Sequence, residues 1–430
     1  MLLHTTSGTE IRGGASAGVT AFCGMRYGQL ATGRRFDPVV PAAPGAAQDL
    51  RDFPAVFPQL PSRLDVLLGT AVEKHPQEED AFLLNVWAPT GASDRPVLFF
   101  IHGGGFMSGG GVLPWYAGQR LALEGDMVVM TMNYRLGPLA HLMIDSSDDD
   151  ANRAVGDLLQ ALTWVRENIA SLGGDPKNIT VAGQSAGAFY SQILAVLPES
   201  RGAIRRLILM SCPGFAASSR RRTESLSTDI IRDLKDEDPR TAPIGHLLAS
   251  HLRVIKKRVE FGVVGSGLMP TVDWRVPGWL GSPARIASAI GVSDLLVTLT
   301  SDETAAYFFN APERDITDEQ VRQLGSGRCV AYDTPYSQLI AVTTDSVFGD
   351  HARALVAESR ERGIRADLRE FTLPSRVDGL GSCHGLDMPF LFGNRAAWAG
   401  AQMLDGIDDD LFEAESAKLR CEVADFVHRR

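Results

Sequence analysis

Short apolar, β-prone runs alternate with longer helical stretches along most of the chain. Runs of strand length occur at 97–101, 127–133, 179–182, 207–210, 295–300 and 367–373. The clearest helical stretches are 157–170 and 186–197, and the second is expected to end where Pro198 would break it. This alternation predicts an α/β fold, in which helices cover both faces of a mostly parallel sheet.

Residues 215–268 interrupt the alternation, because they are polar and charged and carry no strong strand signal. We predict a helical insertion there, lying over the edge of the sheet like a lid. The three arginines at 220–222 are interpreted as a solvated face of this insertion. No linker divides the chain, so residues 1–430 are expected to form a single domain.

The formal net charge of −10 argues against nucleic acid as a partner, since nucleic acid selects basic surfaces. The longest apolar runs are far shorter than the ~20 residues that a bilayer requires, and the N-terminus lacks the features of a signal peptide. The five cysteines are scattered and form no CxxC pair, which favours reduced thiols and a cytoplasmic location. Nothing in the sequence indicates an oligomeric state.

Residues 183–187 read Gly-Gln-Ser-Ala-Gly, a GxSxG pattern between the strand at 179–182 and an apolar helix. A strand–turn–helix of this kind places the serine on a tight turn, and the flanking glycines let the backbone make it. We therefore predict Ser185 as a catalytic nucleophile. The alternative, a glycine-rich loop with an incidental serine, does not explain the strand and helix on either side.

Residues 102–106 read His-Gly-Gly-Gly-Phe and directly follow the strand at 97–101. Consecutive glycines expose backbone N–H groups, which acyl transfer needs where a carbonyl oxygen becomes negative. We predict an oxyanion hole formed by the N–H groups of Gly104, Gly105 and Ala186. A phosphate-binding loop is discounted, because neither GxGxxG nor GxxxxGK[ST] is present.

These motifs and their surroundings resemble the type-B carboxylesterase and cholinesterase-like family. The resemblance rests on EDAFLLNVW at 79–87, the strand and HGGGF at 96–106, NYRLG at 133–137 and the long run at 161–187. It implies an α/β-hydrolase fold and a serine esterase acting on a small-molecule ester. The chain departs from the pattern at Ala81, where secreted members carry a disulfide cysteine, and at Ala188, which replaces a glycine.

In this fold the catalytic triad follows the order serine, acid, histidine. His384 lies in a loop after the strand at 367–373, and its segment resembles the family's HGxE(L)PYVFG, so we predict it as the general base. The family reads KDEG where this chain has Ser301-Asp302-Glu303-Thr304, which implies Glu303 as the acid. Asp302 remains the alternative.

The resemblance also implies a substrate pocket above Ser185, partly roofed by residues 215–268. Its predicted walls are aromatic: Phe106, Trp115, Phe189, Trp274 and Phe308. The predicted activity is hydrolysis of carboxylic esters through an acyl-enzyme. Two alternatives are biosynthetic acyl transfer or lactone formation by the same triad, and a binding protein without catalysis. No histidine pair has metal-ligand spacing, so no metal or other cofactor is expected.

Overall fold

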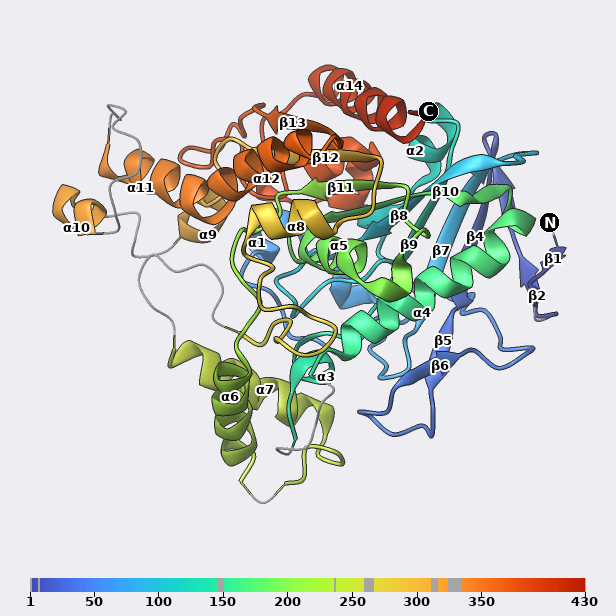
Figure 1. The fold of residues 1–430 in the computed structure, drawn as a ribbon, viewed down its shortest axis with the longest axis horizontal. Helices are drawn as coiled ribbons and strands as arrows, with labels where there is room; N and C mark the ends of the chain where they lie inside the picture. Colours follow the sequence, from blue (N-terminus) through green and yellow to red (C-terminus); the bar gives the residue numbers. More distant parts are fainter. Residues whose placement is uncertain are drawn as a thin grey trace.

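The computed structural model describes residues 2–6, 8–144, 151–235, 237–258, 267–310, 316–323 and 334–429. Its centre is a nine-stranded sheet in the order β13-β12-β11-β10-β8-β9-β7-β4-β3 (Figure 1). The strands are β3 (Gly14–Ser16), β4 (Val19–Arg26), β7 (Leu83–Pro89), β8 (Arg95–Ile101), β9 (Val128–Met132), β10 (Gly174–Gln184), β11 (Arg206–Met210), β12 (Asp294–Thr300) and β13 (Arg365–Phe371).

The strands from β13 to β9 are parallel, whereas β7, β4 and β3 pair antiparallel at one side. Each of the six predicted strands lies in this parallel part, with ends that differ by a few residues. The antiparallel strands were not predicted. Two small separate sheets pair β1 (Leu2–His4) with β2 (Glu10–Arg12) and β5 (Gly28–Leu30) with β6 (Val39–Pro41).

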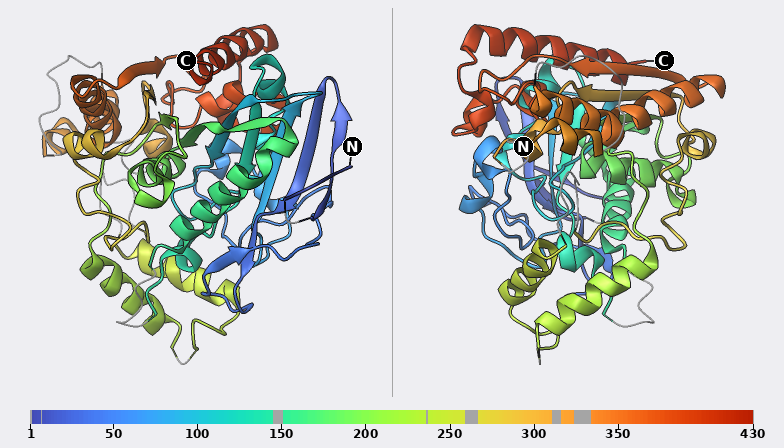
Figure 2. Two further views of the ribbon diagram at one scale, coloured as in Figure 1. Left: turned by 45° about the vertical axis from the view of Figure 1, so that its right-hand side comes forward. Right: turned by 90° about the vertical axis from the view of Figure 1, so that its left-hand side faces the viewer.

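Two groups of helices flank the sheet, as the α/β pattern predicts. One group packs along β10 to β13, and the other packs near β7, β8 and β9 (Figure 2). The first contains α4 (Arg153–Asn168), α5 (Ala186–Val196), α8 (Pro283–Ala289) and α12 (Asp350–Glu361), and the second contains α2 (Gln119–Glu124), α13 (Asp387–Phe392) and α14 (Asp409–Val427). The predicted α/β-hydrolase fold is confirmed.

The remaining described helices are shorter or lie outside these groups: α1 (Asp65–Leu68), α3 (Gly137–His141), α6 (Arg220–Asp233), α7 (Ile244–Lys256), α9 (Ala305–Phe308), α10 (Asp318–Gln323) and α11 (Pro335–Thr344). Across the described ranges, no helix has both the length and the apolar character needed to cross a bilayer.

The predicted insertion at 215–268 contains α6 and α7, which lie together at one end of the molecule (Figure 1). Residue 236 and residues 259–266 of this segment fall outside the described residues. The apolar sides of the two helices form a small core of their own, separate from the main core, built from Leu142, Leu226, Ile230, Leu234, Leu247, Val254 and Leu268. The helical character agrees with the prediction, whereas a lid function stays a prediction.

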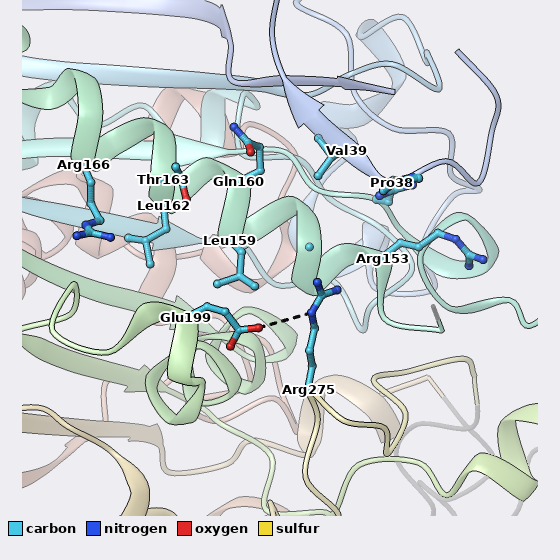
Figure 3. Close-up of a pocket in the computed structure, with 12 residues that line it drawn as sticks. Pro38, Val39, Arg153, Leu159, Gln160, Leu162, Thr163, Arg166, Glu199 and Arg275 are labelled. Atoms are coloured by element: carbon cyan, nitrogen blue, oxygen red, sulfur yellow. Dashed lines mark ion pairs between the residues drawn. The ribbon is translucent and has the colours of Figure 1, made fainter. Parts of the chain in front are cut away.

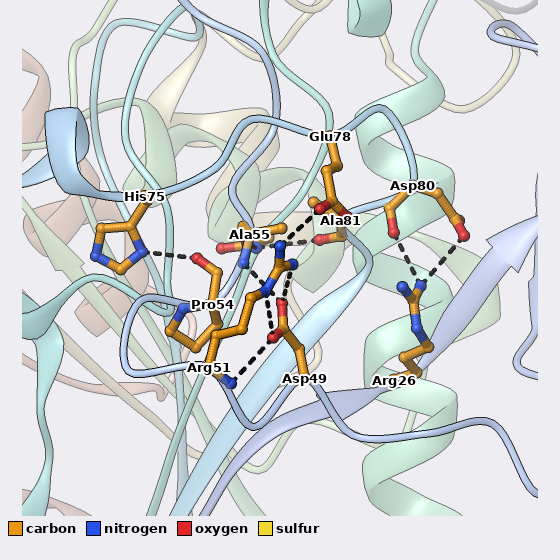
Figure 4. A network of polar contacts seen from close by, with 10 residues as sticks. Arg26, Asp49, Arg51, Pro54, Ala55, His75, Glu78, Asp80 and Ala81 are labelled. Carbon is orange, nitrogen blue, oxygen red and sulfur yellow. Dashed lines mark hydrogen bonds and ion pairs between the residues drawn. The ribbon is translucent and has the colours of Figure 1, made fainter.

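A polar network fixes the long connection between β6 and β7 (Figure 4). The Asp49 carboxylate accepts bonds from the Arg51 guanidinium at 2.5 Å and from the Ala55 N–H at 2.9 Å. Arg51 also donates to Glu78 at 2.9 Å. These bonds tie together two stretches of the connection on either side of α1, the helix that approaches the catalytic loops.

Candidate active site

Ser185 lies on the turn between β10 and α5, with φ 57° and ψ −122°. This is a region of backbone conformation that residues with a side chain rarely adopt. The turn is held on both sides, because the Ser185 N–H donates to the Met210 carbonyl at 2.8 Å and the Phe189 N–H donates to the Ser185 carbonyl at 3.0 Å. The predicted nucleophile therefore sits on a strained turn fixed by its neighbours.

The glycines around Ser185 are required by close backbone packing. A Cβ on Gly183 would collide with the carbonyl of Gly187, and one on Gly187 would collide with the carbonyl of Ile101 at the end of β8. Neither position has room for a methyl group. The two glycines of the GxSxG pattern are thus required because each lies against a backbone carbonyl.

The glycine loop at 102–106 packs directly against this turn. A Cβ on Gly103 would collide with the side-chain oxygen of Gln184 and would lie 3.3 Å from the Cβ of Ser185. Gly104 and Gly105 have φ values of 121° and 60°, and a Cβ on Gly105 would have no atom within 4 Å. The two predicted oxyanion glycines therefore follow a residue that touches the serine turn, and Gly105 borders open space.

His102, which begins this loop, has a structural environment. It is fully buried, its Nδ1 lies 2.7 Å from the Gly103 carbonyl, and its ring stacks on Tyr134 at 4.3 Å. Burial lowers the pKa of His102 to about 4, and the Gly103 carbonyl only partly opposes this effect. The ring is neutral at ordinary pH and fixes the loop.

Glu303 and His384 meet at the carboxyl ends of the parallel strands. The Oε2 atom of Glu303 lies 2.5 Å from Nδ1 of His384, and both side chains are buried. The other carboxylate oxygen of Glu303 accepts the Thr300 N–H at 2.9 Å. The backbone N–H of His384 donates to the backbone carbonyl of Glu303 at 3.2 Å, so backbone and side-chain bonds both fix the pair.

The adjacent carboxylate of Asp302 has a different set of partners. Its Oδ2 accepts the Ser301 hydroxyl at 2.7 Å and the Ser382 N–H at 2.9 Å. The Asp302 N–H donates in turn to the Ser382 carbonyl at 2.9 Å. Asp302 therefore holds the backbone of the loop that carries His384, whereas Glu303 contacts the imidazole itself.

Gln184 and Tyr307, which were not predicted as site residues, contact the predicted base His384. The side-chain nitrogen of Gln184 lies 3.1 Å from Nε2 of His384. The phenol of Tyr307 lies near enough to the Ser185 side chain for the serine to act on its pKa. The Tyr307 ring also packs on the His384 ring, with centroids 5.4 Å apart. Ser185 and His384 are not bonded to each other among the described contacts, and such catalytic bonds often tighten only when substrate binds.

The signals for these two residues were weak but present in the sequence. Gln184 is the first variable position of the GxSxG pattern, and Tyr307, on α9, lies four positions after Glu303, which precedes that helix. A helical turn brings a side chain back to the face of the residue that precedes it by four. Proximity to Ser185, however, joins segments 122 positions apart and has no periodic signal.

A third buried acid lies beside the pair. Asp387, at the start of α13, is buried, and one of its carboxylate oxygens has no hydrogen-bond partner in the described structure. Burial raises the pKa of Asp387 to about 7, and the negative charge of Glu303 adds to the rise, while His384 opposes it. Burial also raises the pKa of Cys383 to about 12, which makes this neighbouring thiol a packed group.

The model of the carboxylesterase family matches residues 3–239, which is more than half of the chain. The chain belongs to the carboxylesterase family. The predicted resemblance is confirmed, and the enzyme is a carboxylic ester hydrolase.

Relatives of this esterase cover nearly its whole length. It is 32% identical to phenmedipham hydrolase of Pseudarthrobacter oxydans, over 95% of this chain and 86% of that protein. It is 30% identical to para-nitrobenzyl esterase of Bacillus subtilis, over 91% of this chain and 82% of that protein. The solved structure of a thermophilic PNB esterase superposes with a TM-score of 0.80 at 26% identity, covering 99% of this chain and 90% of that one.

The aromatic residues predicted to line the esterase's pocket fall into different environments. Phe106 and Phe189 are buried and pack edge to face, with ring centroids 5.8 Å apart. Trp115 is stacked on Trp398 at 4.8 Å, and none of its ring contacts involves the catalytic residues. Phe308 is buried beside Tyr307 in α9.

Trp274, the last predicted pocket residue, is 71% exposed, and the guanidinium of Arg275 covers its ring at 4.3 Å. The ring therefore lies at the surface, and none of its described contacts involves the serine turn. Sequence position alone, next to a family motif, could not reveal that this ring points to solvent.

The esterase also has a cavity of about 300 Å³ away from these residues (Figure 3). It lies between α4, β6 and the residues Glu199 and Arg275, whose charged groups approach to 3.9 Å. No predicted catalytic or pocket residue lines it, so it is distinct from the candidate active site. Within the described ranges, His, Cys, Asp and Glu side chains form no group of three that could hold a metal ion.

Proposed function

We propose that this esterase cleaves carboxylic esters through an acyl-enzyme formed on Ser185, with His384 as general base and Glu303 as the orienting acid. The buried 2.5 Å contact between Glu303 and His384, beside a serine on a strained turn, is the observation that carries the proposal. A serine hydroxyl is a poor nucleophile without such a base and acid. No cofactor takes part.

In the first step the Ser185 oxygen attacks the ester carbonyl carbon while its proton passes to Nε2 of His384. The charge of Glu303 stabilises the imidazolium through the Nδ1 proton. The N–H groups of Gly104, Gly105 and Ala186 donate to the negative carbonyl oxygen. The alcohol leaves with the proton from Nε2, and water then repeats the attack on the acyl-enzyme to release the acid.

The residue assignment is tested with a fluorophosphonate, which should add one covalent mass to the peptide that contains Ser185. Ser185→Ala should abolish the labelling. Ser191→Ala is the matched control, because Ser191 is a buried serine of α5 whose hydroxyl bonds only to the Gly187 carbonyl at 2.8 Å. Labelling that survives Ser185→Ala would refute the assignment.

Hydrolysis is separated from acyl transfer by the fate of the acyl group. In water enriched with heavy oxygen, hydrolysis places one heavy atom in the released acid. Transfer to an added amine or alcohol would place none in the new product. Incorporation that falls in proportion to an added nucleophile at low concentration would favour the biosynthetic alternative.

We also propose that the whole chain acts as one domain and that the insertion at 215–268 forms part of the pocket roof. A Cβ on Gly267 would lie 3.0 Å from the sulfur of Met107, which follows the glycine loop. The end of the insertion therefore approaches the predicted oxyanion hole. A cytoplasmic location, favoured by the scattered cysteines, stays a prediction.

A further inference from the structure

A cation lies one aromatic ring away from the proposed nucleophile. The guanidinium carbon of Arg63 lies 5.3 Å from the centroid of the Tyr307 ring. The phenol of the same tyrosine lies near Ser185, and its ring packs on the His384 ring, with centroids 5.4 Å apart. Arg63, Tyr307 and His384 therefore form a continuous series of contacts from the surface to the proposed base, and Ser185 lies near the Tyr307 phenol.

The segment that carries Arg63 is fixed against the catalytic loops. Asp65, at the start of α1, accepts the Ser62 N–H at 2.8 Å and so closes the turn around Arg63. At the other end of α1, the side chain of Leu68 lies 3.7 Å from where a Cβ on Gly385 would stand. Gly385 directly follows His384, so α1 borders the base.

Arg63 is exposed and has no carboxylate within ion-pairing distance among the described residues. The nearest acid along the chain, Asp65, is directed to the Ser62 N–H. Other arginines of the molecule are paired, for example Arg120 with Glu413 at 2.7 Å. In a chain of net charge −10, an arginine without an ion pair among the described residues places a positive charge one aromatic ring away from the candidate site.

We infer that Arg63 is a specificity-determining residue that favours ester substrates carrying a carboxylate, such as half-esters of dicarboxylic acids. The inference rests on the proposed function, because it takes Ser185 as the reacting group. A carboxylate separated from the ester by about the length of an aromatic ring would reach the guanidinium while the carbonyl lies at Ser185. Guanidinium and carboxylate match in charge and in planar geometry.

The test compares two substrates of equal acyl length, mono-para-nitrophenyl adipate, which ends in a carboxylate, and para-nitrophenyl hexanoate, which does not. The measured quantity is the ratio of their kcat/KM values. Arg63→Gln should lower this ratio roughly 5- to 30-fold, the range expected for a partly exposed charge pair. Arg63→Lys should restore most of it, and about 0.5 M salt should shrink the wild-type preference.

Arg285→Gln is the matched control. Arg285 is also exposed and also stacks on an aromatic ring, that of Trp279 at 5.2 Å, but it lies on α8 and takes no part in the site contacts. The ratio of kcat/KM values measured for Arg285→Gln should equal that of the wild type. A second pair, para-butanoyloxybenzoate and phenyl butanoate, places the carboxylate on the alcohol instead and identifies which half of the ester faces Arg63.

A ratio unchanged by Arg63→Gln within about twofold for both pairs would overturn the inference and leave the proposed function intact. Equal ratios in Arg63→Gln and Arg63→Lys would also overturn it, since the charge would then not matter. Failure of the proposed function has a different signature, because turnover of both neutral esters would survive Ser185→Ala.

Discussion

The two halves of the active site are held together by different kinds of contact. On the nucleophile side, backbone meets backbone: Gly187 lies against the carbonyl of Ile101, and Gly103 lies against the Gln184 and Ser185 turn. On the acid–base side, buried charges decide the arrangement, with Glu303 on His384 at 2.5 Å and Asp387 close by. One added methyl group would therefore disturb the packing of the first half, whereas one added or lost proton would disturb the hydrogen bonds of the second.

The largest effect is expected at the nucleophile. Ser185→Ala should lower kcat by a factor on the order of 10⁵–10⁶, because the base and acid then have no group to activate. Circular dichroism should show an unchanged fold. Residual activity above about 1% of the wild type, measured with para-nitrophenyl hexanoate, would show that another residue attacks the ester.

The same position separates chemistry from backbone strain. With φ 57° and ψ −122°, Ser185 occupies a conformation that costs about 1–3 kcal/mol for residues with a Cβ. Ser185→Gly should lose the same activity as Ser185→Ala but have a higher free energy of unfolding, by about 1 kcal/mol in urea denaturation. A less stable glycine variant would mean that the turn stores no strain.

The second largest effect tests the charged half. Glu303→Gln keeps the shape of the side chain but removes the charge that stabilises the imidazolium, so kcat should fall on the order of 10³–10⁴-fold. Asp302→Asn is the matched control on the next residue, and it should cost about tenfold, because Asp302 bonds to Ser301 and Ser382. The reverse order of losses would show that Asp302 is the acid.

The two halves also differ in how far the sequence predicts them. The glycines at 183, 187 and 103–105 were informative, because a backbone contact that excludes a Cβ leaves a glycine in the sequence. Glu303 was distinguished from Asp302 only by resemblance, since two adjacent carboxylates at a strand end look alike until their partners are known. The two carboxylates have different hydrogen-bond partners, which supports Glu303 as the proposed acid.

Contacts between distant segments were not predicted. Gln184, Tyr307 and Arg63 reach the site through side chains from three separate segments, and neither periodicity nor motif spacing encodes such an encounter. Trp274 shows the opposite error, since a large ring beside a family motif was assigned to the pocket and lies in solvent. Periodic patterns predict where helices and strands lie in the sequence. Which side chains then meet depends on how those elements pack, and the patterns do not encode this.

A smaller effect is expected from the proton on Asp387. Because burial raises its pKa to about 7, folded Asp387 keeps its proton above the pH at which the unfolded carboxyl loses it. The folded state then binds more protons between about pH 4 and pH 7, so its stability falls as pH rises through that window. Asparagine mimics the protonated acid and removes this loss.

Urea denaturation at a series of pH values measures that difference. Between pH 5 and pH 8, the free energy of unfolding should fall by about 2–4 kcal/mol more in the wild type than in Asp387→Asn. Glu370→Gln is the control, because Glu370 is an exposed carboxylate of β13. Parallel curves for wild type and Asp387→Asn would show that Asp387 is already ionised in the folded protein.

The smallest effect concerns the hydroxyl of Tyr307, which lies near both halves. The Tyr307 phenol lies near the Ser185 side chain while its ring contacts His384, so we expect the phenol to compete with the base for the nucleophile. Burial and the charge of Glu303 raise the pKa of Tyr307, although Arg63 and Ser185 oppose the rise. The phenol is therefore neutral at working pH, and the competition should not depend on pH.

Tyr307→Phe keeps the ring and removes only the hydroxyl, and a hydrogen bond of this hydroxyl to Ser185 would be worth about 0.5–1.5 kcal/mol for a neutral pair. The second-order rate constant for fluorophosphonate labelling should therefore rise about two- to tenfold, equally at pH 6.5 and pH 8.5. Tyr336→Phe, whose hydroxyl donates to the Gly379 carbonyl at 3.2 Å, should leave the rate unchanged. A fall in the labelling rate of Tyr307→Phe would instead mean that the phenol donates to the serine oxygen during attack. Tyr307 would then assist the nucleophile together with Glu303 and His384.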